Sequence, residues 1–368
     1  MIKFFDLSKQ QKIIKKSLDH NIKSVLKNNK YIQGLEVYEL EKKLSQFVLS
    51  KNCITNASGT DSLLLALMAI GIKKGDEVIT SPFSFVSAVE SIILLGARPI
   101  FVDINLQTFN IDESKIESAI TKKTKAIIPV SLFGQIPNFD IINLIAKKFN
   151  IIVIEDAAQS LGSIFKNKYS CNLSTIACTS FFPTKPLGCY GDGGACFTNN
   201  KILAKKIKDL SLHGKANKKF YYNLPGINSR LDTIQASILL SKLEIFKKEI
   251  RLRQKVAKNY DRLFKGCENN LTIPFINSDC TSVYAQYTIK AEKRDKLRKY
   301  LLKFNIPTII YYPFSLNKLK YLKNKQTCPV SELVVKKVLS LPFDPYLSLN
   351  KQKFIVNKIK SFYKNENY

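Results

Sequence analysis

Between about residues 50 and 200, short apolar runs alternate with amphipathic stretches. A short apolar run bounded by turn residues predicts a buried strand, whereas apolar residues repeating every three or four positions predict a helix. The pattern predicts strands within 52–55, 76–80, 98–104, 124–132 and 151–156, and helices within 59–72, 84–96 and 139–150. This alternation is typical of a largely parallel sheet that is covered by helices.

The pattern changes after residue 200. Long helical segments are predicted within 201–214 and 230–265, followed by a strand within 282–291, a helix near 293–304 and further helices toward the end. We therefore expect an α/β protein of two domains. The large α/β domain, with a mostly parallel central sheet and an N-terminal helical segment, would comprise residues 1–245, and a smaller C-terminal α+β domain residues 246–368.

The composition is consistent with a large folded core and limits the kinds of catalytic or metal site that the chain can form. The 368 residues are 45% hydrophobic, but no apolar run reaches the roughly 20 residues of a membrane helix, and the first residues lack a signal-peptide pattern. A cytoplasmic location is therefore expected. Eight cysteines without a C-x-x-C pair indicate neither a disulfide framework nor a zinc site, and two histidines leave little material for a metal centre or a Ser-His-Asp relay.

The formal net charge of +29 raises the possibility of a nucleic-acid partner. The lysines are spread along helical faces, and no helix-turn-helix, zinc finger or RNP-like run is present. We therefore expect no specific nucleic-acid function, although a regulator that binds through its basic surface is kept as the alternative of a different class.

Polar residues that follow buried strands are the first candidates for chemistry, because ligands of open α/β sheets bind at the carboxyl ends of strands. The run "IIVIEDAAQS" ends in Glu155 and Asp156, which need partners if they are buried, although Asp156 could simply cap a helix. In "TSFFPTKPLGCYGDGG", Lys185 lies between Pro183 and Pro186 ahead of a glycine cluster. A lysine held in this way can have a depressed pKa and react as an amine.

An acid at one strand end and a lysine at another indicate pyridoxal phosphate (PLP). This cofactor needs an amine for its aldehyde, an anion for its pyridine nitrogen and donors for its phosphate. The segment "NASGTDSLLLAL" places Ser58, Gly59 and Thr60 at a helix amino end, where phosphate is favoured, although the same residues also form an ordinary N-cap. Phe85 follows another strand and could stack on a flat ring, or belong to the core.

These motifs occur together in a known family. The segments "SGTDSL", "GDEVITSPFSFVSA", "EDAAQSLGS", "SFFPTKPLGCYGDGGA" and "GINSRLDTIQASIL" resemble, in order and spacing, the DegT/DnrJ/EryC1/StrS sugar-nucleotide aminotransferases. The resemblance extends from "FFDLSKQ" to about residue 345. It implies a PLP-dependent transferase of fold type I, similar to aspartate aminotransferase, that works as a homodimer with a shared active site.

The resemblance also assigns roles to single positions. It implies that Lys185 binds the cofactor covalently and carries protons, and that Asp156 pairs with the pyridine nitrogen. Further cofactor contacts are implied for Gln159 near the ring, Phe85 stacked on it, and Gly59, Thr60, Ser180 and, from the neighbouring subunit, Asn228 at the phosphate. Substrate contacts are implied for Arg230, which would bind a sugar carboxylate, for Tyr312 and, more weakly, for Tyr31.

Within the family, "SCNLSTIACTSFFPTKPLGCYGDGGA" and "IPTIIYYPFSLNK" most resemble the aminotransferases of UDP-2-acetamido-2-deoxy-3-oxo-glucuronate. The implied reaction takes an amino group from L-glutamate for a bacterial surface polysaccharide such as O-antigen. Another 3-keto or 4-keto nucleotide hexose is the alternative substrate. A sugar dehydratase of the same fold is disfavoured, because those relatives carry histidine in place of the lysine. Tyr311 stands where the similar members tend to have histidine, which bears on substrate geometry and leaves the cofactor site unaffected.

Overall fold

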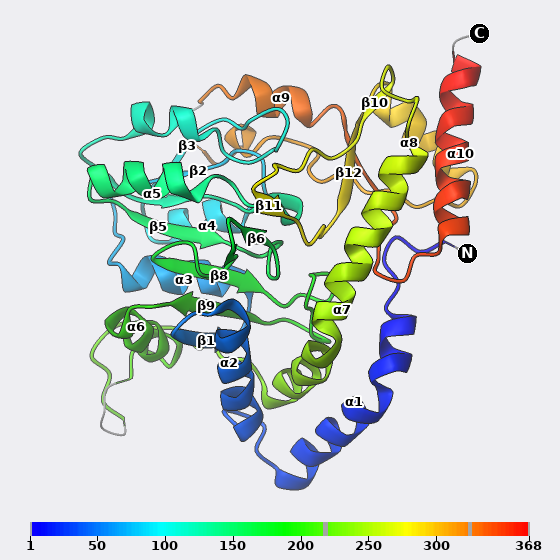
Figure 1. Cartoon of the computed structure of the whole chain (residues 1–368). Coiled ribbons are helices and arrows are strands. Elements are labelled where there is room, and N and C mark those ends of the chain that lie inside the picture. Colours follow the sequence, from blue (N-terminus) through cyan, green and yellow to red (C-terminus); the bar gives the residue numbers. More distant parts are fainter. Residues whose placement is uncertain (1, 216–219, 323–325, 367–368) are drawn as a thin grey trace.

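The computed structural model describes residues 2–215, 220–322 and 326–366 and is built on a central seven-stranded sheet (Figure 1). The strand order is β1-β9-β8-β5-β4-β2-β3, and β9 is antiparallel to both of its neighbours, whereas the other pairs are parallel. The strands are β1 (Asn52–Asn56), β2 (Glu77–Thr80), β3 (Arg98–Phe101), β4 (Thr124–Ile128), β5 (Ile152–Asp156), β8 (Ile176–Ser180) and β9 (Gly194–Thr198). A mostly parallel sheet, as predicted, is therefore confirmed.

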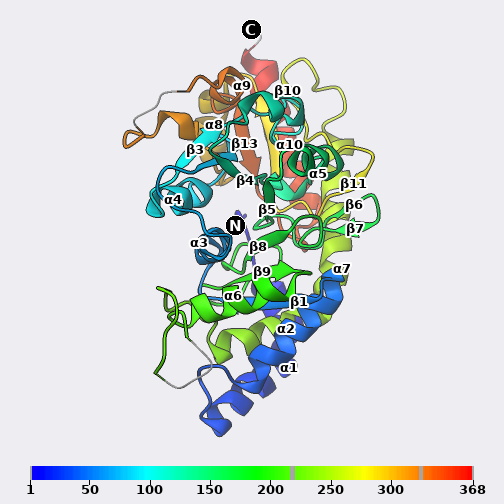
Figure 2. The same cartoon turned by 90° about the vertical axis from the view of Figure 1, so that its left-hand side faces the viewer.

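Both faces of this sheet are buried because successive side chains of each strand point to opposite faces. Ile154 of β5 packs with α3 (Gly59–Ala69), α4 (Ser87–Leu94) and α6 (Lys201–Ser211), whereas its neighbour Val153 packs with α5 (Phe139–Lys148). Figure 2 shows α3 and α4 on one side of the central strands and α5 on the other. Toward β1, the second face is covered by α2 (Leu35–Val48) and the first half of α7 (Thr233–Leu263).

The C-terminal part of the chain forms its own apolar cluster around a small antiparallel sheet. The sheet consists of β10 (Leu271–Thr272), β12 (Tyr287–Ala291) and β13 (Val338–Leu341). The second half of α7, α8 (Arg294–Leu302) and α10 (Leu349–Glu366) pack on it. Helix α7 continues without interruption through residues 245 and 246. A domain boundary at residue 246 therefore stays a proposal, based on the separate apolar clusters on the two halves of this helix.

The remaining elements join the two parts. Helix α1 (Ser8–Asn28) packs along α7, and the amide of Phe343 donates to the carbonyl of Phe4. A third small sheet pairs β11 (Cys280–Thr281) with β6 (Ile164–Phe165), which also pairs with β7 (Lys168–Tyr169). Helix α9 (Pro329–Val334) and short 3-10 turns at Glu113–Lys115, Glu117–Ala119, Leu132–Gly134 and Leu316–Lys318 complete the described elements. No helix among the described residues is both long and apolar enough to cross a bilayer.

Candidate active site

The candidate residues meet at one edge of the central sheet. Strands β1, β8, β5, β4 and β2 run in the same direction, so their carboxyl ends share that edge. Asn56 of β1 and Ser180 of β8 both pair with Gly194, which fixes the height of these two ends. Asp156 closes β5 beside Cys178 of β8. The sheet thus brings together segments that are more than a hundred residues apart in the chain.

Asp156 is 4% exposed and lies directly at the end of its strand. One carboxylate oxygen accepts a hydrogen bond from the amide of Ala158, at 3.1 Å, so the side chain closes a tight turn and caps no α-helix. Burial raises the pKa of Asp156, and the charge of Lys185 opposes that shift. The Ala158 amide and the Lys185 charge thus both favour the ionised form of this acid.

Lys185 lies in a loop that leaves β8 and returns to β9. Backbone bonds close the loop, from Phe181 to the carbonyl of Gly193 at 2.7 Å and from Lys185 to that of Phe182 at 2.9 Å. Burial lowers the pKa of Lys185, and the neighbouring Asp156 partly restores it. The amine and the acid predicted from the sequence are therefore close enough to interact electrostatically, and a lowered pKa increases the fraction of lysine that can act as a nucleophile.

The amino end of α3 lies against Ser180. A side-chain carbon added at Gly59 would come within 2.6 Å of the Ser180 Cβ, so only glycine allows this approach. The Ser58 hydroxyl accepts a bond from the Asp61 amide at 3.0 Å, which confirms the predicted N-cap. The backbone N–H groups of Gly59 and Thr60 lie in the first turn of α3, before that of Asp61. N–H groups in the first turn have no hydrogen-bond acceptor within the helix. Together with the Ser180 hydroxyl they form a cradle suited to an anion.

Two further predicted residues, Gln159 and Phe85, lie next to the predicted Tyr312. The amide nitrogen of Gln159 donates to the Tyr312 hydroxyl at 3.1 Å, while the Gln159 oxygen accepts from the amide of Phe133 at 2.9 Å. The rings of Phe85 and Tyr312 lie 6.4 Å apart. Phe85 is 53% exposed, so its ring is available to a ligand and does not belong to the core. Burial raises the pKa of Tyr312, and the Asp156 charge adds to this effect.

Asn228, Arg230 and Tyr31 lie outside this cluster of contacts. Ser229 fastens their segment to α3, since its hydroxyl donates to Asp61 at 2.7 Å and accepts from the Ala57 amide at 3.1 Å. Asn228 is exposed and Arg230 is half-buried. The Tyr31 hydroxyl donates to Asn29 at 2.9 Å, and its carbonyl accepts from the amide of Thr233. Asn228 and Arg230 thus flank the residue that is fastened to the amino end of α3, whereas the contacts of Tyr31 lie with Asn29 and Thr233.

The sequence predicts that the two acids at the end of β5 need hydrogen-bond partners if they are buried. In the structure, Glu155 has three such partners. Its fully buried carboxylate accepts bonds from the hydroxyls of Ser131 and Ser170, at 2.9 and 2.7 Å, and from the amide of Cys171 at 2.9 Å. These donors oppose the burial that raises the pKa of Glu155. Neither serine was predicted, because single serines in loops carry no distinctive pattern.

Replacing Glu155 by alanine is expected to lower the free energy of unfolding by about 2 kcal/mol, because three buried donors would lose their acceptor. Urea unfolding measures the change, and Glu39→Ala is the control. Glu39 is an exposed acid in an i,i+4 ion pair with Lys43, so its removal should cost less than about 0.5 kcal/mol. Equal effects of the two substitutions would contradict a structural role for Glu155.

The donor set at this edge fits PLP. An amine with a lowered pKa is coupled to a buried acid, an exposed aromatic ring lies nearby, and a glycine-lined cradle lies at a helix amino end. These are the groups that the aldehyde, the pyridine nitrogen, the ring face and the phosphate of the cofactor require.

Comparisons with known proteins agree with this arrangement. The model of the DegT/DnrJ/EryC1/StrS aminotransferase family matches residues 12–360. The chain is 51% identical over 356 residues to the UDP-2-acetamido-2-deoxy-3-oxo-D-glucuronate aminotransferase of Pseudomonas aeruginosa, over 96% of this chain and 98% of that protein.

Two solved structures are similar over nearly the whole chain. A DegT DnrJ EryC1 StrS aminotransferase from Brucella abortus has a TM-score of 0.95 and 38% identity, covering 98% of this chain and 99% of that one. The ntda protein from Bacillus subtilis, with bound cofactor PMP, has a TM-score of 0.90 and 31% identity, covering 95% of this chain and 82% of that one.

Proposed function

Since the chain belongs to the DegT/DnrJ/EryC1/StrS aminotransferase family, it is a PLP-dependent transferase of fold type I, and we propose that it aminates UDP-2-acetamido-2-deoxy-3-oxo-glucuronate with L-glutamate as donor. The relative from Pseudomonas aeruginosa, at 51% identity, supports this substrate. The observation that carries the proposal is the placement of Asp156, at the end of β5, beside β8 and the loop that carries Lys185.

When bound, PLP acts as an electron sink that lets nitrogen pass from donor to acceptor. Lys185 would hold the cofactor and, when released, move the proton, a task for which its lowered pKa suits it. Asp156 would keep the pyridine nitrogen protonated. A chain with two histidines can manage its proton transfers in this way.

The other predicted residues divide between the cofactor and its surroundings. Gly59, Thr60 and Ser180 would bind the phosphate, Phe85 would cover one ring face, and Gln159 would lie near the ring oxygen. We propose that Asn228 completes the phosphate site of a neighbouring subunit in a homodimer. Its exposure in the single chain is consistent with this role, since the residue is free to reach another copy.

We further propose that Arg230, Tyr312 and Tyr31 bind the sugar. A guanidinium can grip a carboxylate with two parallel hydrogen bonds, which suits a glucuronate. The hydroxyl of Tyr312 is held by Gln159, which would place a hydrogen-bonding group next to the cofactor.

Arg230→Ala is expected to raise KM for the acidic UDP-sugar by about 10- to 100-fold, because a charge-assisted bidentate contact is lost. The KM for a neutral 3-keto sugar should change much less. Steady-state kinetics on both sugars measures the ratio, with Arg251→Ala, an exposed arginine of α7, as the control. Equal increases for acidic and neutral sugars would contradict the carboxylate contact.

Incubation of the protein with PLP, glutamate and a panel of UDP-ketosugars tests the function itself. We expect 2-oxoglutarate to form with the 3-oxo-glucuronate derivative. Turnover only with another 3-keto or 4-keto hexose would move the substrate assignment within the family. Salt-dependent retention on duplex DNA without turnover would instead favour a regulator. We place the reaction in the cytoplasm, and its product in a bacterial surface polysaccharide such as O-antigen.

A further inference from the structure

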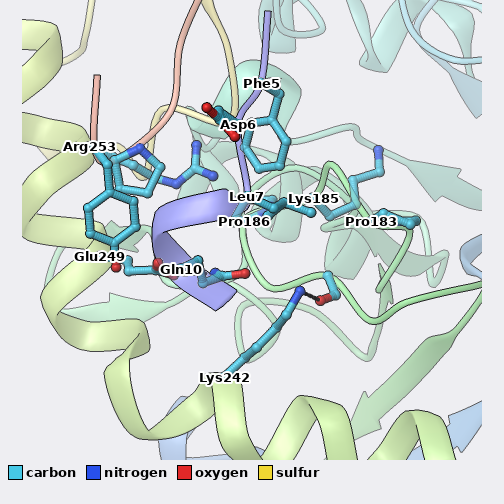
Figure 3. Close-up of a pocket in the computed structure, with 13 residues that line it drawn as sticks. Phe5, Asp6, Leu7, Gln10, Pro183, Lys185, Pro186, Lys242, Glu249 and Arg253 are labelled. Carbon is cyan, nitrogen blue, oxygen red and sulfur yellow. Dashed lines mark hydrogen bonds between the residues drawn. The ribbon is translucent and has the colours of Figure 1, made fainter. Parts of the chain in front are cut away.

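A polar stripe on α7 lies behind the loop that carries Lys185. Gln235, Lys242 and Glu249 follow one another at seven-residue spacing, so they lie on the same side of the helix. Lys242 and Glu249 line a small cavity together with Pro183, Lys185 and other residues (Figure 3). The opposite wall comes from the segment that leads into α1.

Lys242 is 1% exposed, which is unusual for a lysine. Its ammonium group donates a hydrogen bond of 2.5 Å to the carbonyl of Gly188, and it lies 4.3 Å from the centre of the Tyr190 ring. Burial lowers the pKa of Lys242 to about 8. A buried ammonium is costly unless it is well paired, so the carbonyl and the ring are the contacts that hold it there.

Gln235, about two turns before Lys242 on α7, holds Tyr190, two residues after Gly188 in the same loop. Its side-chain oxygen accepts from the amide of Tyr190 at 2.9 Å, and its amide nitrogen donates to the Tyr190 carbonyl at 3.4 Å. The loop has little room to relax, because a carbon added at Gly188 would come within 2.6 Å of the carbonyls of Phe182 and Pro183. Helix α7 therefore fixes the backbone just after Lys185.

Figure 3 shows Lys242 reaching the loop from below, while the Lys185 side chain points away from Glu249 and Arg253. The pKa of Lys185 responds to burial and to Asp156. Lys242 thus touches the backbone that carries the reactive lysine, from the side opposite to its amine.

We propose that Lys242 is a positioning residue for Lys185. Its bond to Gly188 holds the loop from which Lys185 would bind the cofactor beside Asp156. The inference rests on the proposed function, because it gives Lys185 the covalent bond to PLP. It adds a residue that acts through the backbone of the loop and touches neither cofactor nor substrate.

A double-mutant cycle tests this inference. The binding of PLP is measured by equilibrium dialysis for the unaltered chain, Lys242→Met, Lys185→Ala and the double variant. Lys242→Met keeps an unbranched side chain of nearly the same length and removes its donor. We expect it to weaken PLP binding about tenfold when Lys185 is present and less than about twofold in the Lys185→Ala background, because only the covalent bond depends on the loop.

Turnover supplies a second readout. For Lys242→Met, kcat should fall about tenfold while KM for the UDP-sugar stays within about twofold, since the sugar contacts do not involve the loop. Lys242→Arg, which retains a donor for the Gly188 carbonyl, should recover most of the lost PLP affinity and kcat. Lys248→Met, at an exposed lysine on the same helix, is the matched control and should leave both quantities unchanged.

The outcomes separate the alternatives. Equal weakening of PLP binding in both backgrounds would mean that Lys242 only stabilises the fold, and unchanged binding in the Lys185 background would mean that it does not position the loop. Circular dichroism checks folding, and Lys242→Leu, which also lacks a donor, takes the place of Lys242→Met in the cycle if the latter unfolds. Failure of the unaltered chain to bind PLP would refute the proposed function itself, a result distinct from the other two.

Discussion

Lys185→Ala is expected to abolish amino transfer, with kcat falling by roughly 10³-fold or more, because one side chain supplies both the covalent attachment and the proton carrier. The variant should still bind PLP, since the cradle at Gly59 and Ser180 is unchanged, but borohydride reduction should no longer fix the cofactor to the protein. Kinetics and peptide mass mapping after reduction measure the two effects.

Two controls separate chemistry from charge in this experiment. Lys185→Arg keeps a positive charge beside Asp156 but removes a reactive amine, so it should be as inactive as the alanine variant. Lys201→Ala, at an exposed lysine that begins α6, should retain full turnover and the label on Lys185. A cofactor label that persists on another lysine in the Lys185→Ala variant would contradict the assignment.

Asp156→Asn is expected to lower kcat by about 10² to 10⁴-fold, because a neutral amide cannot keep the pyridine nitrogen protonated. The covalent label on Lys185 should persist, since the amine remains in place. Asp192→Asn is the control: this acid of the same loop is exposed, so its replacement should leave the enzyme active. An active Asp156→Asn variant would show that another group holds the ring nitrogen.

The sequence pattern predicted most of the elements because their signals are local. The four residues 151–154 that precede Glu155 and Asp156 are all apolar, which predicted a strand buried on both faces. Strand β5 is buried as expected. Strand β9, which is antiparallel to both of its neighbours in the central sheet, was not among the predicted strands. The capping role of Ser58 followed from the residues next to it and is confirmed.

The candidate site divides in the same way. Lys185 between two prolines and Asp156 after an apolar run have local signatures, and the structure brings these two residues together. Lys242 has no such signature, because it is one of several lysines in α7 and the sequence contains 58 lysines and arginines. Its burial could therefore not be predicted from its residue type. The seven-residue spacing of Gln235, Lys242 and Glu249 is a signal that could have indicated a buried polar stripe.

The sequence by itself determined the alternation of strands and helices, the reactive amine and its acid, because periodicity and backbone restraint are properties of neighbouring residues. Only the tertiary structure decided that Gln159 would hold Tyr312, that Ser131 and Ser170 would bind Glu155, and that Lys242 would hold the Lys185 loop. Those contacts join residues far apart in the chain, and burial in a shared core gives each hydrogen bond its importance.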